Sequence, residues 1–237
     1  MVLAFIMFNE IKMKYLIGVA LWFSILGVSA QSLVAIDSNY VFSGYMERLG
    51  QYRQMPVLPR AIVFLGNSLT DAGKWNDIIP GQPVLNRGIS GDISYGVFAR
   101  LDEVVRHQPK KVFLMIGIND LKRGVPTENI VQNYIRIVRI IQQESPKTII
   151  YLNSILPVNP SKLIESFKAV KNSDIEILND GLKSIAQNQK SIHFVDLHQI
   201  FADDNGDLKA DVTPDGIHLE VFAYVELVNY LKKVKAL

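Results

Sequence analysis

Five short apolar runs recur along the chain, separated by longer stretches in which apolar and polar residues mix. Most of the runs are continuous rather than alternating, which is typical of strands buried on both faces of a parallel sheet. The predicted strands are Ala61–Leu65, Pro83–Leu85, Lys111–Ile116, Thr148–Leu152 and Ile192–Val195.

The stretches between the runs carry helical periodicity. Segment 125–144 has apolar residues at spacings of four, three and four, which places them on one helix face: Ile130, Tyr134, Ile137 and Ile141. A final helix near 219–234 is predicted to bury a similar stripe: Val221, Val225, Val228 and Leu231. A further helix is expected around 37–54, before the first strand.

Alternation of strands and helices predicts an α/β fold, a three-layer α/β/α sandwich around a five-stranded parallel sheet. Ligand sites of such sheets lie beyond the carboxyl ends of the strands. The residues that follow each predicted strand are therefore the first place to look for chemistry.

The first thirty residues have a different pattern. Lys12 and Lys14 precede an apolar run from Tyr15 to Leu26, and the small residues Val28-Ser29-Ala30 follow. This order predicts a secretory signal peptide over residues 1–30 and a single domain over residues 31–237. Residues 1–12 are interpreted as extra upstream sequence, because Met13 gives a cleaner start. The run is short for a membrane span, which needs about 20 apolar residues. The alternatives are an uncleaved anchor and a buried helix.

Composition excludes several classes of function. The 237 residues contain no cysteine, which excludes disulfide scaffolds, thiolate metal sites and a cysteine nucleophile. Lys and Arg number 25 against 23 Asp and Glu, so the net charge is too small to indicate nucleic-acid binding. Only four histidines are present, without a His-Glu-x-x-His pair, and we expect neither a metal nor another cofactor.

Four blocks suited to acyl chemistry stand after strands or before the last helix: GNSLT (66–70), NRGISGD (86–92), GIND (117–120) and DGIH (215–218). In these blocks and their order the chain resembles the SGNH hydrolases, also called GDSL-type esterases and lipases. The likeness extends to exported bacterial acyl hydrolases and carbohydrate acetylesterases, and it implies their flavodoxin-like sheet. One departure is Asn67, where the family name has Asp.

The resemblance implies a catalytic triad of Ser68, Asp215 and His218. Ser68 would be the nucleophile, His218 the general base and then acid, and Asp215 the group that orients the histidine ring. Each residue also has a structural interpretation. Ser68 fits a helix N-cap, and Asp215 fits a turn in Pro214-Asp215-Gly216.

The resemblance further implies an oxyanion hole formed by the backbone N–H groups of Ser68 and Gly91 and by the Asn119 side chain. The structural alternatives are a turn glycine at position 91 and a helix-capping asparagine at position 119.

The roles of several neighbouring residues stay open at this point. Charged residues flank the blocks, and a solvated or structural role is expected for them over sugar binding: Asp71, Arg87, Asp92 and Asp120. Asn153 and Asn159 are expected to border the cleft. His107 is expected as a surface cap, and His193 and His198 as structural, with reach to a cleft as the alternative for His198.

The resulting hypothesis is an exported serine esterase, periplasmic or secreted, that removes small acyl groups, above all acetyl, from carbohydrate through an acyl-enzyme. Its partner would be a small-molecule or carbohydrate ester. We expect neither a nucleic acid partner nor a membrane span once the signal is removed; the oligomeric state stays open. The alternatives are a lysophospholipase or lipase, a catalytically silent carbohydrate-binding protein and a flavodoxin-like carrier.

Overall fold

A five-stranded, wholly parallel sheet organises residues 38–237, the part of the chain that the computed structural model describes. Its strand order is β2-β1-β3-β4-β5. The strands are β1 Ile62–Gly66, β2 Val84–Gly88, β3 Lys111–Met115, β4 Ile149–Asn153 and β5 Ile192–Val195. Every predicted strand is present, and the predicted α/β sandwich is confirmed.

Two strands continue into polar residues beyond their predicted ends. β2 continues through Asn86 and Arg87 to Gly88, because each of these residues still pairs with β1. β4 likewise includes Asn153, which pairs with Val195 of β5. The predicted strands were bounded by their apolar runs, so both were predicted to end before these polar residues.

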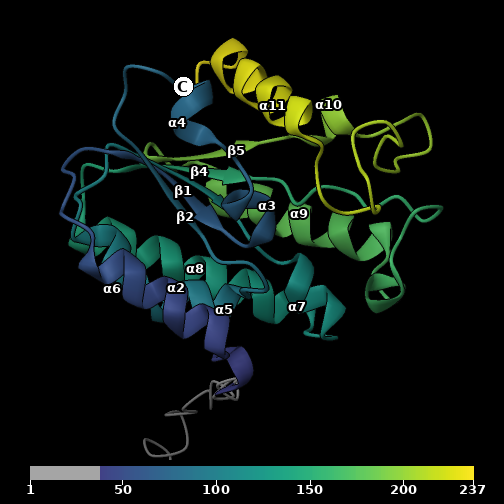
Figure 1. The fold of residues 1–237 in the computed structure, drawn as a ribbon, viewed down its shortest axis with the longest axis horizontal. Coiled ribbons are helices and arrows are strands. Elements are labelled where there is room, and N and C mark those ends of the chain that lie inside the picture. Colours follow the sequence, from purple (N-terminus) through teal and green to yellow (C-terminus); the bar gives the residue numbers. More distant parts are fainter. Residues whose placement is uncertain (1–37) are drawn as a thin grey trace, which may run out of the picture. The chain divides into compact units, whose positions relative to one another are not determined.

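Helices cover both faces of the sheet (Figure 1). One layer contains α2, α5, α6 and α8, and the opposite layer contains α4, α10 and α11. The helices with their bounds are η1 Ser38–Tyr40, α2 Ser43–Gln54, α3 Ser68–Asp71, α4 Trp75–Ile78, α5 Ser94–Ala99, α6 Leu101–Val105, α7 Ile118–Lys122, α8 Thr127–Glu144, η2 Glu165–Phe167, α9 Asn172–Ala186, α10 His198–Phe201 and α11 Val221–Lys233.

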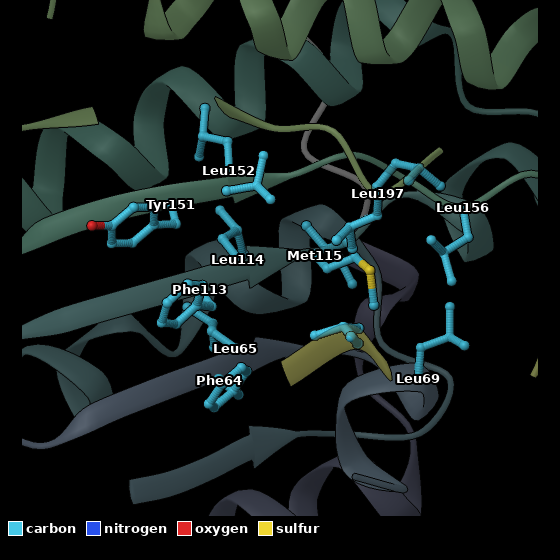
Figure 2. Close-up of a cluster of buried hydrophobic side chains, with 14 of the residues drawn as sticks. Phe64, Leu65, Leu69, Phe113, Leu114, Met115, Tyr151, Leu152, Leu156 and Leu197 are labelled. Carbon is cyan, nitrogen blue, oxygen red and sulfur yellow. The ribbon is translucent and has the colours of Figure 1, made fainter. Parts of the chain in front are cut away.

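The two faces of the sheet are packed differently. Phe64, Phe113 and Tyr151 occupy paired positions on neighbouring strands, and their rings stack with centroids 4.9 and 4.7 Å apart (Figure 2). Trp75 of α4 stacks on Phe64 at 3.9 Å, which fixes that helix against the sheet. Alternation along each strand turns the next residues, among them Leu114, to the other face. Burial on both faces explains the continuous apolar runs.

The long helices test the predicted stripes. All four stripe residues of α8 are buried, as predicted. In α11 the prediction is half wrong, since Val221 and Val225 are 75% and 44% exposed while Val228 and Leu231 are buried. The face that packs on the sheet also includes Tyr224, whose ring meets Trp75 edge-on. Because several adjacent apolar residues share this helix, periodicity alone did not choose the buried face.

Upstream of the first strand, the helix predicted around 37–54 appears as η1 followed by α2. The predicted signal peptide, and the boundary after residue 30, lie outside the described residues. Among the helices of residues 38–237, none is both long and apolar enough to cross a membrane.

The two faces of α11 give a matched pair of variants. Leu231→Ala removes a fully buried side chain, and we expect the free energy of unfolding to fall by about 2–5 kcal/mol. Val225→Ala on the exposed face should change it by no more than about 0.5 kcal/mol. Urea unfolding followed by circular dichroism measures both, and equal losses would contradict the assigned packing face.

Candidate active site

The four sequence blocks meet at the carboxyl edge of the sheet. β1 lies between β2 and β3. The chain runs from β1 to β2 on one side and then crosses to β3 on the other side of β1. This reversal is the switch point at which open α/β sheets hold ligands. Ser68 follows β1, Gly91 follows β2 and Asn119 follows β3, so the switch point gathers three of the predicted residues.

Ser68 occupies the first position of the short helix α3 rather than its N-cap. The N-cap is Asn67, whose side chain accepts a hydrogen bond from the Leu69 N–H at 3.1 Å. An aspartate would cap this turn in the same way. The Asn that departs from the family name therefore preserves the backbone that presents Ser68.

A chain of hydrogen bonds links the three residues predicted as a triad. The Ser68 Oγ lies 2.9 Å from His218 Nε2, and His218 Nδ1 lies 2.6 Å from Asp215 Oδ2. All three side chains are half-buried at the surface of the sheet edge. The imidazole is thus placed to take a proton from the hydroxyl on one side while a carboxylate holds its other nitrogen.

Asp215 combines both of its predicted roles. Its Oδ1 accepts hydrogen bonds from the backbone N–H groups of Ile217 and His218, which closes the turn, while Oδ2 faces the His218 ring. Partial burial raises the pKa of Asp215, but these hydrogen bonds lower it more, so the pKa lies below its ordinary value. The group is therefore a carboxylate at neutral pH, as an orienting partner of the histidine requires.

Gly91 and Asn119 are held next to each other by Asp92. The Asp92 N–H donates to Ile89 O in a tight turn, in which Gly91 has a φ of +85° that side chains disfavour. Asn119 Nδ2 donates to the Asp92 carbonyl at 2.9 Å. One N–H of this amide is thereby used to orient the side chain beside the Gly91 turn. The turn interpretation of Gly91 is correct, and it is compatible with a donor role.

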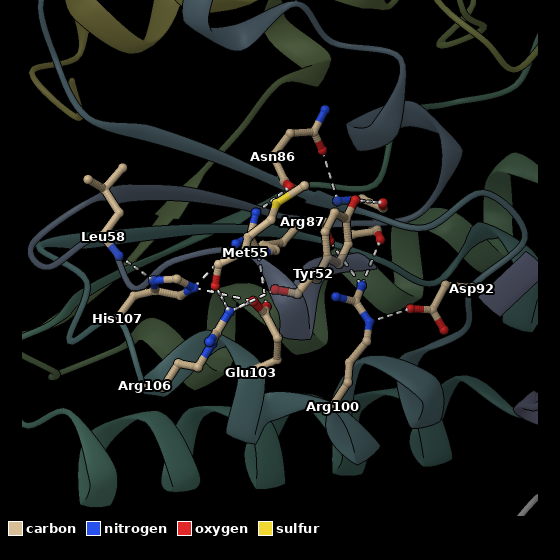
Figure 3. A network of polar contacts seen from close by, with 12 residues as sticks. Tyr52, Met55, Leu58, Asn86, Arg87, Asp92, Arg100, Glu103, Arg106 and His107 are labelled. Atoms are coloured by element: carbon tan, nitrogen blue, oxygen red, sulfur yellow. Dashed lines mark hydrogen bonds and ion pairs between the residues drawn. The ribbon is translucent and has the colours of Figure 1, made fainter. Parts of the chain in front are cut away.

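Arg100 was not singled out from the sequence, yet it holds this edge together (Figure 3). Its Nε pairs with Asp92 Oδ2 at 3.0 Å, and its Nη2 donates to the carbonyls of Gly66 and Arg87 at 3.2 and 3.0 Å. Arg100 and Asp92 are both fully buried. The guanidinium thus joins the ends of β1 and β2 to the residue that orients Asn119.

A second buried carboxylate lies beside Asn119. Asp120 accepts hydrogen bonds from the backbone N–H and hydroxyl of Ser94, and that hydroxyl also accepts one from Asn133. Burial raises the pKa of Asp120 to about 7 despite the lowering effect of Ser94. Burial likewise raises the pKa of Asp92 to about 6, against the lowering effect of Arg100. Both acids are structural, as expected, but they are buried rather than solvated.

The expected surface role of His107 is wrong. This side chain is fully buried, and its Nδ1 accepts a hydrogen bond from the Leu58 N–H at 2.9 Å (Figure 3). Its Nε2 faces Glu103, whose other oxygen pairs with buried Arg87 at 2.9 Å. Burial lowers the pKa of His107 more than Glu103 raises it. Arg87 and His107 therefore belong to a structural network under β2.

The remaining histidines lie away from Ser68. His198 opens α10, where its Nε2 lies 3.3 Å from Asn179 Nδ2 and 3.1 Å from Ile155 O. His193 is exposed on the edge strand β5. The structure gives neither residue a contact with the triad, and His218 alone pairs with the serine.

Asn159 and Asp71 have local partners, whereas the buried Oδ1 of Asn153 has no hydrogen-bond partner among the described residues. Asn159 is buried, and its N–H donates to Gly216 O, which ties its loop to the turn that carries His218. Asn153 is buried at the end of β4. Asp71 is half-buried and pairs with Arg48 of α2 at 3.3 Å. Within residues 38–237, no three His, Asp or Glu side chains are grouped to hold a metal ion.

Comparison with known proteins agrees with this geometry. The sequence matches the GDSL-like Lipase/Acylhydrolase family over residues 64–224, which include all four blocks. The chain belongs to this family. It is an ester hydrolase of the SGNH type, and the resemblance found in the sequence is confirmed.

Solved structures of other GDSL hydrolases and esterases share the fold. A Streptococcus pneumonia protein named for platelet activating factor is 28% identical, with a TM-score of 0.72 over 80% of this chain and 90% of that one. A GDSL-like lipase from Bacteroides thetaiotaomicron is 23% identical, with a TM-score of 0.67 over 81% and 98%. An acetyl-xylooligosaccharide esterase from Geobacillus Stearmophilus is 20% identical, with a TM-score of 0.57 over 76% and 96%. No curated protein matches the chain significantly.

The buried carboxylates predict how stability depends on pH. The pKa of Asp120 is about 7 in the folded protein against an ordinary 3.8, so between these values the folded state binds more protons than the unfolded state. The free energy of unfolding should therefore fall as pH rises from about 4 to 7. Asp120→Asn keeps an acceptor for the Ser94 N–H but does not titrate, and it should flatten this decline.

Urea unfolding at a series of pH values measures the effect. Asp180→Asn, at an exposed position of α9, serves as the control and should keep the slope of the parent protein. A slope unchanged by Asp120→Asn would contradict the assignment. Some slope should remain in that variant, because Asp92 also titrates in this range.

Proposed function

We propose that this hydrolase is a serine esterase that works through an acyl-enzyme, with Ser68, His218 and Asp215 as its catalytic triad. The observation that carries the proposal is the unbroken hydrogen-bond chain from the Ser68 hydroxyl to the Asp215 carboxylate. The same chain argues against a silent binding protein, since such a protein has no need for a base aligned on a serine. It equally argues against a flavin carrier.

In the first half of the reaction, Ser68 Oγ attacks the ester carbonyl carbon while its proton passes to His218 Nε2. The carbonyl π electrons move to oxygen, and the resulting oxyanion accepts hydrogen bonds from the N–H groups of Ser68 and Gly91 and from the Asn119 amide. Such a donor is typically worth 10²–10³-fold in kcat, on the order of 3 kcal/mol. The carbon–alkoxy bond then breaks, and the alcohol leaves with the proton from His218.

In the second half, water attacks the acyl-enzyme carbonyl and gives a proton to the same nitrogen. Collapse of the second oxyanion breaks the bond to Ser68 Oγ, which recovers its proton from His218, and the carboxylic acid leaves. Asp215 stays ionised throughout and stabilises the imidazolium in both halves. Its lowered pKa supports this role.

For the substrate, we propose small acyl groups, above all acetyl, esterified to carbohydrate. Support comes from the signal-peptide pattern of the N-terminal sequence, from which we propose that the enzyme is periplasmic or secreted. An acetyl-xylooligosaccharide esterase and an acetyl xylan esterase are among the structures that share the fold. A lysophospholipid or another lipid ester is the competing substrate.

The nucleophile is tested by Ser68→Ala. We expect kcat for 4-nitrophenyl acetate to fall by about 10⁴-fold or more, because the variant lacks the hydroxyl on which the acyl-enzyme is proposed to form. Ser173→Ala is the matched control, since Ser173 also lies in the first turn of a helix but is exposed on α9. A fluorophosphonate probe should label the parent and the control but not Ser68→Ala. Full activity or labelling of that variant would show that another residue is the nucleophile.

Acyl length separates the two substrate classes. We expect kcat/KM for 4-nitrophenyl acetate to exceed that for the octanoate, because an enzyme for acetyl groups has no use for a long apolar trough. The two esters share one leaving group, so the comparison isolates the acyl chain. A clear preference for the octanoate would favour the lipid substrate.

A further inference from the structure

A polar cavity of about 300 Å³ lies directly beside the proposed oxyanion hole. Helix α2 contributes Glu47, Arg48 and Gln51 to its lining, and Asp71 and Ser90 form the opposite side. Ser90 is bonded to Gly91, and Asp71 stands one helical turn after Ser68. A group attached to an ester at Ser68 therefore has this cavity as a neighbour. Helix α2 precedes the residues that match the family.

A neighbouring cavity shares two lining residues with this one, and the two cavities together are called the groove. A second cavity of about 480 Å³ runs along the edge strand β2, lined among others by Lys74, Asp77 and Asn86. Arg48 and Asp71 line both cavities, and their ion pair of 3.3 Å stands where the two meet. A path for an extended ligand thus leads away from the nucleophile along one edge of the sheet.

An aromatic ring, that of Phe42, lies near both Gly91 and Gly44. A methyl group placed on Gly91 would lie 3.3 Å from Phe42 Cζ, and one placed on Gly44 would lie 3.4 Å from Phe42 Cε2. Gly44 itself lines the first cavity. The half-buried ring of Phe42 is therefore close to the Gly91 turn and to one residue of the cavity lining. Aromatic faces beside polar side chains suit sugar rings, which present C–H groups on their faces and hydroxyls at their edges.

The charges of the groove favour a neutral ligand. Across the two cavities the formal charges balance, with three carboxylates, Glu47, Asp71 and Asp77, and three cations, Arg48, Lys74 and Arg87. A phosphate-bearing headgroup therefore meets no excess of cations, whereas sugar hydroxyls can donate to carboxylates and accept from cations.

We propose that this groove binds the sugar chain of an acetylated oligosaccharide, with Phe42 as the platform nearest the ester. The inference rests on the proposed function. If the acyl group is small, the alcohol is the larger part of the substrate and is the part that the groove has to bind. It goes further by locating the subsite that recognises the carbohydrate. The residues of α2 then determine substrate choice without taking part in the chemistry.

Two substrates with a common acetyl group test the subsite: 4-nitrophenyl acetate and per-O-acetylated xylobiose. Glu47→Ala and Gln51→Ala truncate exposed cavity residues, and Phe42→Leu keeps apolar packing but removes the ring face. Each should lower kcat/KM for the acetylated sugar by about three- to tenfold, the value of one lost polar or stacking contact. The rate of 4-nitrophenyl acetate hydrolysis should change by no more than about twofold, because this ester has no sugar to contact the groove. A twofold change is smaller than the value of one hydrogen bond. Met46→Ala, exposed on the same helix, is the control and should change neither rate.

Binding of the free sugar provides a second measurement. Xylobiose should inhibit 4-nitrophenyl acetate hydrolysis competitively, and less strongly in the three variants. Three results would overturn the subsite. The three variants could lose equal activity on both substrates, or they could keep unchanged kinetics with the acetylated sugar. Alternatively, glycerophosphocholine could inhibit in place of xylobiose. If the parent enzyme hydrolyses neither ester, the proposed function fails instead, so the two failures are distinct.

Discussion

The buried guanidinium of Arg100 connects the segments on which the proposed chemistry depends. It binds the backbone at the ends of β1 and β2 and pairs with Asp92, whose carbonyl in turn holds Asn119. Removing one member of a buried ion pair typically costs about 3–5 kcal/mol, because the remaining charge loses its partner. The buried contacts of Arg100 therefore help to fix the spacing between the serine turn and the proposed oxyanion donors.

A second ionic cluster lies under the same sheet edge and explains why β2 can be both polar and buried. Arg87 projects from the strand to Glu103 of α6, and His107 completes the cluster from the end of that helix. The Tyr52 ring lies over the same guanidinium at 4.6 Å, which seats α2 against the strand. The helix that lines the groove is thus positioned by the network that supports the second block, so the proposed subsite and the proposed oxyanion hole share one support.

The site residues that the sequence predicted came from the family resemblance, which also supplied the pairing of Ser68 with His218 across 150 positions. The Asp215–His218 contact lies within one turn, so its spacing of three residues also pointed to it. Arg100 acts through residues 8, 13 and 34 positions away, and no local pattern marks an arginine for such contacts. The exposed face of α11 was missed for a related reason, because only the tertiary neighbours Trp75 and the sheet choose among its apolar residues.

The triad turn shows why functional and structural interpretations of one residue need not compete. A carboxylate has two oxygens, and Asp215 uses one to close the turn and the other to hold the histidine ring. The backbone hydrogen bonds that fold the turn also lower the pKa of the carboxyl group, so they favour the charge on which an orienting role depends. The local fold of the turn and the ionisation state needed for catalysis therefore arise from the same hydrogen bonds.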